Sequence, residues 1–130
     1  MVSYMLLYLM ILAIVMTKDI DSDKAMLSLQ MGNEYFLKGD IDNSISNYKQ
    51  AISLDPNYIS AYSNLGNALK DKGSYDESID IHTKAITLDP NNHKLYYNLG
   101  VVLQLKMQYN DAIVAYRHSI SLNPNHVNSI

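Results

Sequence analysis

One seven-residue pattern occurs three times in this chain, as AISLDPN at residues 51–57, AITLDPN at 85–91 and SISLNPN at 119–125. The copies start 34 residues apart, and residues outside them match at the same interval. The matching positions are Gly32, Gly66 and Gly100; Ile45, Ile79 and Ile113; Ile52, Ile86 and Ile120; Leu54, Leu88 and Leu122; and Pro56, Pro90 and Pro124. A fixed period with this many matches indicates an array of structural repeats.

The period divides the chain into segments. They are an apolar segment at 1–16, a polar linker at 17–24, three units at 25–58, 59–92 and 93–126, and the start of a truncated fourth unit at 127–130. A length of 130 residues, of which 48% are apolar and 18% charged, fits a single folded domain.

The charge balance and the missing cysteines exclude several classes of function. The net charge is −3, and the chain has one arginine, Arg117, and no basic cluster. A nucleic-acid surface needs many cations in one patch, so we exclude nucleic-acid binding. Because the chain has no cysteine, it has neither disulfides nor thiolate metal sites.

Each unit is expected to form two helices. Tyr62, Leu65 and Leu69 have the spacing of one helical face. The first helices are expected to end near Gly39 and Gly73, because glycine suits a left-handed C-terminal cap. In the third unit Met107 stands in place of that glycine, and we expect a slightly strained turn there.

The second helix of each unit is expected to run from the turn to the residue before the proline. It should begin near Asp40, Ser74 or Gln108. It should end by the residue before the proline, because proline disfavours helix at the preceding residue. Asparagine often caps a helix N-terminus. The residues expected to cap the following helices are Asn57, Asn91 and Asn125.

The pattern resembles the tetratricopeptide repeat, a 34-residue helix–turn–helix unit, over residues 25–126. The family's small residues correspond to Gly32, Gly66 and Gly100 on the first helices, and to Ser44, Ser78, Ala112, Ala51, Ala85 and Ser119 on the second. Small side chains let the helices of a pair approach closely, while Tyr48, His82 and Tyr116 are expected to fill the gap between pairs. The resemblance implies an all-α, right-handed superhelical solenoid of such pairs.

The resemblance also implies a non-catalytic protein–protein interaction module. In the family, the first helices line a concave groove that binds peptides or extended segments of partner proteins. The residues of this chain expected to face the groove are Gln30, Asn33, Asn64, Asn67, Lys94, Tyr97, Asn98 and Val101.

Two more specific resemblances concern this groove. SNLGNAL and YNLGVVL, which contain Asn64 and Asn98, are similar to the repeats of protein O-linked N-acetylglucosamine transferases, whose matching asparagines form a ladder. Asn33, Asn64 and Lys94 also match part of the carboxylate clamp of chaperone-binding repeat proteins. In that clamp Leu29 replaces a lysine and Asn98 replaces an arginine, so two of its cations are missing.

No catalytic or cofactor motif appears in the sequence. The histidines, His82, His93, His118 and His126, are scattered, and His82 takes an aromatic core position, where we expect its ring to be satisfied by hydrogen bonds. Asp19, Asp21 and Asp23 alternate but lack the glycine and glutamate of a calcium loop, so we interpret them as a solvated acidic linker. We expect neither a metal nor a cofactor.

The apolar segment 1–16 leaves three alternatives open. It carries no charged residue, and as a helix it would be about 24 Å long, somewhat short for a bilayer core of about 30 Å. It is a membrane anchor, a cleaved signal without the usual basic start, or a segment upstream of a true start at Met16 or docked as a terminal helix. Cytoplasmic localisation is favoured, with membrane association as the alternative.

The C-terminal end lacks the polar capping helix that such arrays usually need. Ile130 falls at the register of Tyr62 and Tyr96, so residues 127–130 correspond to a further unit. The last helix, with Val114 and Ile120, is therefore expected to present an apolar face. The alternatives are that the chain is a fragment of a longer array, or that this face is covered by another copy of the chain or by a partner.

Overall fold

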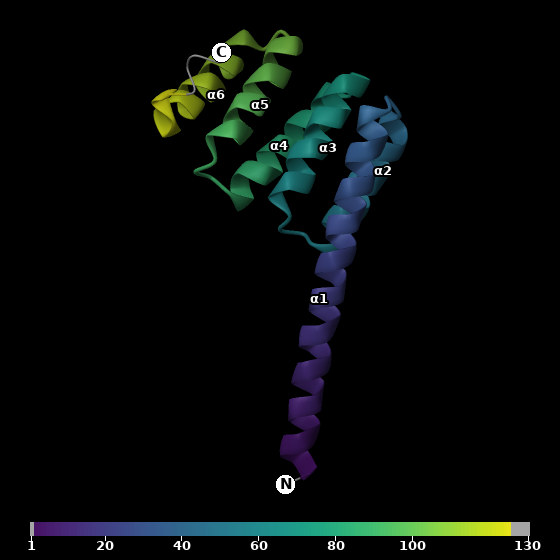
Figure 1. The fold of residues 1–130 in the computed structure, drawn as a ribbon. Coiled ribbons are helices and arrows are strands. Elements are labelled where there is room, and N and C mark those ends of the chain that lie inside the picture. Colours follow the sequence, from purple (N-terminus) through teal and green to yellow (C-terminus); the bar gives the residue numbers. More distant parts are fainter. Residues whose placement is uncertain (1, 126–130) are drawn as a thin grey trace.

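The structure is a computed structural model and describes residues 2–125. Six α-helices and no strands lie within these residues. They are α1 (Val2–Leu37), α2 (Ile41–Leu54), α3 (Ile59–Lys72), α4 (Tyr75–Leu88), α5 (His93–Leu105) and α6 (Tyr109–Leu122). Consecutive helices form pairs, and the pairs stack side by side into a right-handed superhelical solenoid (Figure 1). The predicted fold class is confirmed.

The turn within each pair has a left-handed residue at the predicted place. Gly39 has φ 80° and Gly73 has φ 85°, a region that costs glycine little. Met107 adopts φ 63° at the equivalent position of the third pair. Because a side chain disfavours this region, the third turn is the strained one, as predicted.

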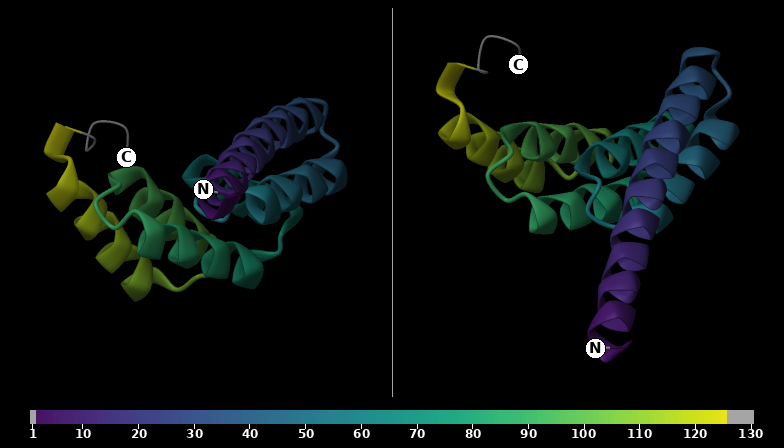
Figure 2. Two further views of the ribbon diagram at one scale, coloured as in Figure 1. Left: turned by 90° about the horizontal axis from the view of Figure 1, so that it is seen from below. Right: turned by 60° about the horizontal axis from the view of Figure 1, so that its bottom comes forward.

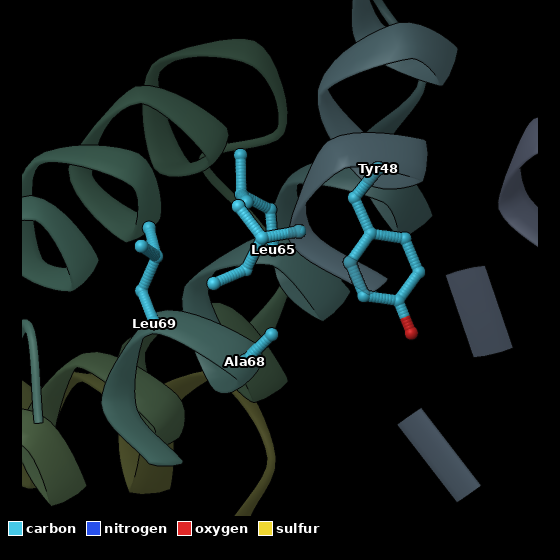
Figure 3. Packing of buried hydrophobic residues seen from close by; sticks show 5 residues of the cluster. Tyr48, Leu65, Ala68 and Leu69 are labelled. Carbon is cyan, nitrogen blue, oxygen red and sulfur yellow. The ribbon is translucent and has the colours of Figure 1, made fainter. Parts of the chain in front are cut away.

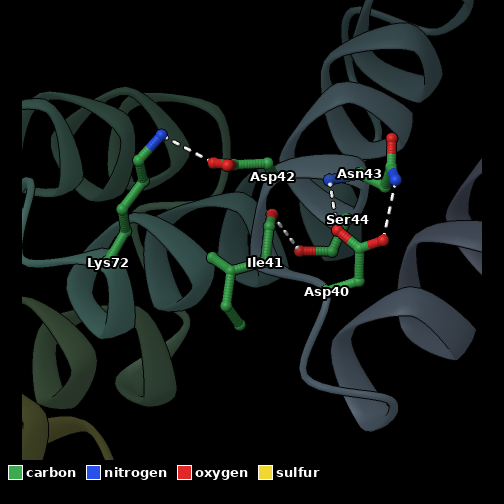
Figure 4. Close-up of polar contacts among 6 residues, drawn as sticks. All are labelled: Asp40, Ile41, Asp42, Asn43, Ser44 and Lys72. Carbon is green, nitrogen blue, oxygen red and sulfur yellow. Dashed lines mark hydrogen bonds and ion pairs between the residues drawn. The ribbon is translucent and has the colours of Figure 1, made fainter.

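The second helices begin and end where the sequence predicts. Asp40 is the N-cap of α2, and its carboxylate accepts a hydrogen bond of 3.2 Å from the backbone N–H of Asn43 (Figure 4). The N-caps of α4 and α6 are Ser74 and Gln108. All three helices stop two residues before a proline.

The predicted caps of the first helices are wrong by one residue. The N-cap of α3 is Tyr58, and the N-cap of α5 is Asn92, whose side chain accepts from the N–H of Lys94. Asn57 does not cap α3. Its N–H donates to the side chain of Asp55, and this local turn places the helix start one residue later. The helix predicted after Asn125 lies outside the described residues.

The loops between pairs show why the seven-residue pattern recurs. The hydroxyl of Tyr62 donates to the carbonyl of Pro56 at 2.9 Å, and Tyr96 makes the same bond to Pro90. Each bond ties a proline-containing loop to the helix that follows it. The first two copies of the pattern therefore each supply one joint of the same kind between stacked pairs.

Each pair is closed by a glycine facing an aromatic ring. A Cβ added at Gly32 would lie 2.5 Å from the Tyr48 ring, and one at Gly66 would lie 2.5 Å from the His82 ring. These rings therefore fill the gap within their own pair, whereas the sequence placed them only between pairs. Tyr48 reaches both places, because it also packs with Leu65 of the next pair (Figure 3).

The small residues of the second helices are buried, and their serines are satisfied. Ser78 Oγ donates to the carbonyl of Gly66 at 2.6 Å, and Ser119 Oγ donates to the carbonyl of His93 at 2.8 Å. Both bonds cross from the second helix of a pair to the first. They explain how serine is accommodated where the family usually has alanine, because a buried hydroxyl needs a partner.

An ion pair recurs between successive units. Lys72 Nζ lies 2.7 Å from Asp42 Oδ1 (Figure 4), and Lys106 pairs with Asp76 at the equivalent place. The hydrogen bond to Asp42 and its charge raise the pKa of Lys72. These exposed pairs help set the register of one unit on the next.

The N-terminal part of α1 projects from the solenoid as a bare helix (Figures 1 and 2). Residues 3–24 are all exposed, and Ala25 is the first buried residue. Residues 17–24, predicted as a polar linker, are therefore part of a continuous helix. The alternative in which the apolar segment docks on the domain as a terminal helix is wrong. An 18-residue window of α1 has a mean hydropathy of 1.6, so this helix is long and apolar enough to cross a membrane.

The C-terminal face is apolar in part. Val114 is 66% exposed, as predicted, and Ile113 and Tyr109 are exposed beside it. Ile120 was expected on the same face but is half-buried. Residues 127–130 lie outside the described residues.

Candidate functional site

The concave side of the solenoid contains a cavity of about 580 Å³, here called the groove. It is formed by α1, α3 and α5, with one ring from α2. The residues that line it are Asn33, Phe36, Leu37, Tyr48, Asn64, Asn67, Lys70, Asp71, Tyr97, Asn98 and Val101.

The structure brings six of the eight predicted groove residues together. Asn33, Asn64, Asn67, Tyr97, Asn98 and Val101 line the groove, whereas Gln30 and Lys94 are exposed and do not. The cavity lies along the C-terminal parts of the first helices, and Gln30 and Lys94 lie toward their N-terminal side. That these residues contact a ligand stays a prediction.

The prediction missed the next helical turn. Phe36 and Leu37 follow Asn33 by three and four residues, and Lys70 and Asp71 follow Asn67 in the same way. Residues at these spacings share one helix face, so extending the predicted face by one turn would have found all four.

A hydrogen-bonded cluster joins three helices at one end of the groove. The side-chain carbonyl of Asn33 accepts from the hydroxyl of Tyr48 at 2.9 Å and from the amide of Asn64 at 2.8 Å. Burial raises the pKa of Tyr48, so its hydroxyl stays protonated as the donor. The amide orientation of Asn33 is thereby fixed, with its N–H groups left for other partners.

The second ladder asparagine makes an equivalent bond one unit later. Asn98 Nδ2 donates to Ser63 Oγ at 3.3 Å, which links α5 to α3. Asn64 and Asn98 thus each bond to the first helix of the preceding unit. Both side chains hold neighbouring units together and lie at the groove surface.

The groove is electrically balanced. Lys70 is the only cation among its lining residues, and its Nζ lies 3.4 Å from Asp71 Oδ1, which is also in the lining. Four of the remaining lining residues are asparagines, which are neutral. The site is therefore rich in paired donors and acceptors and poor in net charge.

His82 lies on α4, and its ring packs against Gly66 of α3. The ring is fully buried against Gly66, and within residues 2–125 neither ring nitrogen has a hydrogen-bond partner. The prediction of a core histidine is confirmed, but its expected hydrogen bonds are absent. Burial, with a smaller effect of the Lys70 charge, lowers the pKa of His82 to about 4, so the ring is neutral at pH 7.

The remaining polar residues singled out in the sequence have structural surroundings. His118 stacks on Tyr96 with ring centres 4.1 Å apart, and His93 Nε2 lies 3.1 Å from the amide of Asn123. The aspartates at positions 19, 21 and 23 lie on the exposed part of α1 rather than in a loop. His126 lies outside the described residues.

Comparisons with known proteins agree with this architecture. The family model of the TPR repeat matches residues 32–73 and 66–106, and the model of the tetratricopeptide repeat matches residues 93–126. These matches cover more than half of the chain. No curated protein sequence in the comparison matches the chain.

Many solved structures are similar to this chain, among them the following three. The TPR2B domain of yeast Sti1 in its pHsp70 complex is 30% identical, with a TM-score of 0.77 over 83% of this chain and 86% of that one. The Arabidopsis OM64 TPR domain is 21% identical, with a TM-score of 0.78 over 84% and 90%. The first TPR of Spaghetti (RPAP3), bound to the HSP90 peptide SRMEEVD, is 23% identical, with a TM-score of 0.79 over 83% and 86%.

The 34-residue period, the stacked helix pairs and the matched family models all describe one kind of repeat, found in protein-interaction domains. The chain belongs to the tetratricopeptide repeat family.

Proposed function

We propose that the chain is a non-catalytic interaction module that binds an extended, uncharged segment of a partner protein in its concave groove. The observation that carries this proposal is the set of four asparagine side chains in a groove with no net charge. An extended segment exposes backbone N–H and C=O groups that have no partner of their own. A side-chain amide offers one donor group and one acceptor, so it pairs with such a backbone whatever its side chains are.

The cluster around Asn33 leaves suitable groups for this purpose. Asn64 uses one N–H in its bond to Asn33 and retains its carbonyl oxygen and second N–H. Asn33 uses its carbonyl for two bonds and retains its amide N–H groups. Phe36 and Val101 add apolar surface beside these amides, so the groove suits a segment with apolar side chains.

The asparagine ladder is part of the same proposal. It rests on Asn64 and Asn98 and on their resemblance to transferase repeats, since the similar structures named above are of other kinds. Their bonds to the preceding unit support a ladder that is built into the solenoid. No catalytic step is assigned to these residues.

A chaperone tail is the alternative occupant. Two of the similar structures are complexes, one with an HSP90 peptide and one with pHsp70. Recognition of a terminal carboxylate depends strongly on charged donors. In this chain the single groove cation is paired with Asp71, Lys94 is outside the groove, and Leu29 and Asn98 replace two cations of the clamp.

The test is selection of peptides from a random display library with the full chain in mild detergent. Selected peptides are synthesised with free and amidated C-termini, and their affinities are measured by fluorescence anisotropy. We expect binding at least tenfold weaker for Asn64→Ala/Asn98→Ala. The matched control is Asn47→Ala/Asn110→Ala, which removes two asparagines from second helices outside the groove and should bind as wild type.

A second arm distinguishes the two occupants. The peptide SRMEEVD should bind weakly to the wild type and gain affinity in Leu29→Lys/Asn98→Arg, which restores the missing cations. Tight binding of SRMEEVD to the wild type, lost when its C-terminus is amidated, would favour the chaperone-tail alternative. Equal affinities for Asn64→Ala/Asn98→Ala and for the control variant would contradict the asparagine ladder.

We propose membrane tethering as a second function of α1. The observation that favours it is an uncharged apolar helix that stands free of the solenoid, with residues 3–16 all exposed. Co-flotation of the full chain with phosphatidylcholine vesicles tests this. Retention at high salt and alkaline pH is expected, and release under those conditions would contradict it. The groove would then lie on the cytoplasmic side of the membrane.

Self-association at the C-terminal end is a lesser proposal. Tyr109, Ile113 and Val114 present adjoining apolar side chains on α6. Sedimentation of Val114→Glu against wild type, both in the same detergent, measures it. A larger species for the wild type alone supports it, and a monomer for both over a wide concentration range contradicts it.

A further inference from the structure

We propose that α1 is a rigid stalk that holds the peptide groove at a fixed height above a lipid bilayer. This inference rests on the proposed tether and adds to it the position of the groove. The tether requires only that the apolar segment enters the membrane. The rigid stalk requires in addition that no joint separates that segment from the groove.

The sequence and the structure agree on an uninterrupted helix. Glycine and proline are absent from residues 1–31, and these are the residues that most often break or kink a helix. The α-helix runs from Val2 to Leu37 without a break, through the polar residues 17–24. The same helix therefore contains the bare apolar segment and one wall of the groove, at Asn33, Phe36 and Leu37.

The apolar segment suits lipid better than a protein partner. A helix that docks on a protein has one apolar stripe and a polar opposite side, whereas a helix that is apolar all round belongs in a core or a membrane. Residues 4–16 are apolar on every side, and their large side chains range from 41% exposed at Leu12 to 78% at Tyr4. The hydroxyl of Thr17 donates to the carbonyl of Ile14 at 2.9 Å, so the first polar side chain after this segment is satisfied within the helix.

The length of the segment sets how it enters. At 1.5 Å per residue, residues 2–16 span about 22 Å, against about 30 Å for a bilayer core. Local thinning accommodates a short span at modest cost. The stem of Lys18 can also lie along the apolar boundary with its amine among the head groups.

The height of the groove follows from the helical rise. Asn33 lies 17 residues after Met16, which places it roughly 25 Å beyond the end of the apolar segment. The loops that join α2 to α3 and α4 to α5 lie at the end of the solenoid nearest the stalk (Figure 1). The groove thus lies at one fixed height above the membrane, and these loops lie between the groove and the membrane.

The absence of native cysteine allows a direct test in the full chain. Single variants Lys24→Cys and Lys38→Cys place a donor dye at two exposed sites 14 residues apart on and just after α1, roughly 21 Å by helical rise. The protein is bound to phosphatidylcholine vesicles whose outer head groups carry an acceptor dye. We expect strong energy transfer from position 24 and at least twofold weaker transfer from position 38.

The matched control replaces residues 17–24 with eight glycine and serine residues in the Lys38→Cys variant. This change keeps the apolar segment and the solenoid but introduces a flexible joint. Energy transfer from position 38 should rise, because the solenoid then reaches positions closer to the membrane.

Flotation and energy transfer separate the two proposals. Failure to float with vesicles would refute the tether and the stalk together. Flotation with equal transfer from positions 24 and 38 would leave the tether standing and overturn the stalk, since the helix would then lie along the surface. Equal transfer in the joint variant and its rigid parent would also overturn the stalk.

Discussion

The two halves of α1 have the same backbone conformation and opposite surroundings. Residues 25–37 pack against α2 and form one wall of the groove, beginning with the buried Ala25. Residues 3–24 are exposed throughout. In the packed half, Gly32 lets the Tyr48 ring of the second helix approach closely, whereas residues 4–16 of the bare half carry exposed apolar side chains on every side.

The difference shows that helical structure alone does not identify a partner. The packed half is stabilised by burial against its own repeat, as is usual for helices in proteins. The bare half presents a long apolar surface without such burial, and water is an unfavourable environment for that surface. The proposed tether gives it a separate environment, the membrane. Changes matched between the two halves test this assignment.

The largest effect is expected from a large side chain at Gly32. A Cβ there would already lie 2.5 Å from the Tyr48 ring, and leucine adds further atoms in the same place. Gly32→Leu should lower the free energy of unfolding by about 3 kcal/mol or more through overpacking. Chemical unfolding of the full chain in mild detergent, followed by circular dichroism, measures it.

The matched change in the bare half is Ala13→Leu, at an exposed position of the same helix. It should leave the unfolding of the solenoid unchanged, because no other helix packs there. A comparable loss of stability in both variants would show that the first half of α1 packs against the protein after all.

Acid should distinguish the solenoid from the bare half of α1. The pKa of His82 falls from 6.5 in the unfolded chain to about 4 in the folded one, so the unfolded chain takes up the proton first. The contribution of neutral His82 to stability is complete above pH 6.5 and is lost as the pH falls to about 4, a change of about 3 kcal/mol. Residues 2–16 carry no group that titrates in this range.

His82→Phe is the control, since Tyr48 and Tyr116 show that a six-membered ring fits opposite the glycine. Denaturation midpoints of both proteins are compared between pH 7 and pH 4. The variant should lose the part of the pH dependence that belongs to His82. Identical pH profiles would contradict an unpartnered, neutral histidine in the core.

A smaller effect is expected from loss of single side-chain hydrogen bonds. Asn33→Ala removes the acceptor of Tyr48 and Asn64 and should cost about 1–2 kcal/mol. Thr17→Ala removes an exposed bond to Ile14 in the bare half and should change stability by less than about 0.5 kcal/mol. Thermal unfolding of both variants beside wild type measures the difference, and equal losses would contradict the polar cluster.

Much of the solenoid was predictable because its signals are local. Gly39 and Gly73 end helices through their own backbone freedom, and Asp40 caps α2 through its own side chain. The proline of each loop acts on the residue before it. The caps at Asn57 and Asn91 failed because the aspartate two residues earlier begins a turn in each loop. Its backbone carbonyl accepts from the N–H three residues on, and the helix start shifts by one residue.

The rest depends on contacts between repeats, which the period does not specify. The 34-residue period does not say which turn of each first helix lines the cavity, whose lining includes Phe36 and Lys70 but not Gln30 or Lys94. The missing partners of His82 depend likewise on what surrounds its ring. The polar residues 17–24 were interpreted as a linker, although nothing in them breaks a helix.

The central claim is that the groove, with the packed half of α1 as one wall, is the ligand site. Hydrogen–deuterium exchange of the full chain, with and without a peptide selected on it, tests this claim directly. The account predicts protection within residues 32–37, 63–71 and 97–101, and none within 3–16 or in α4 and α6. Protection centred on the second helices or on residues 3–16 would contradict it.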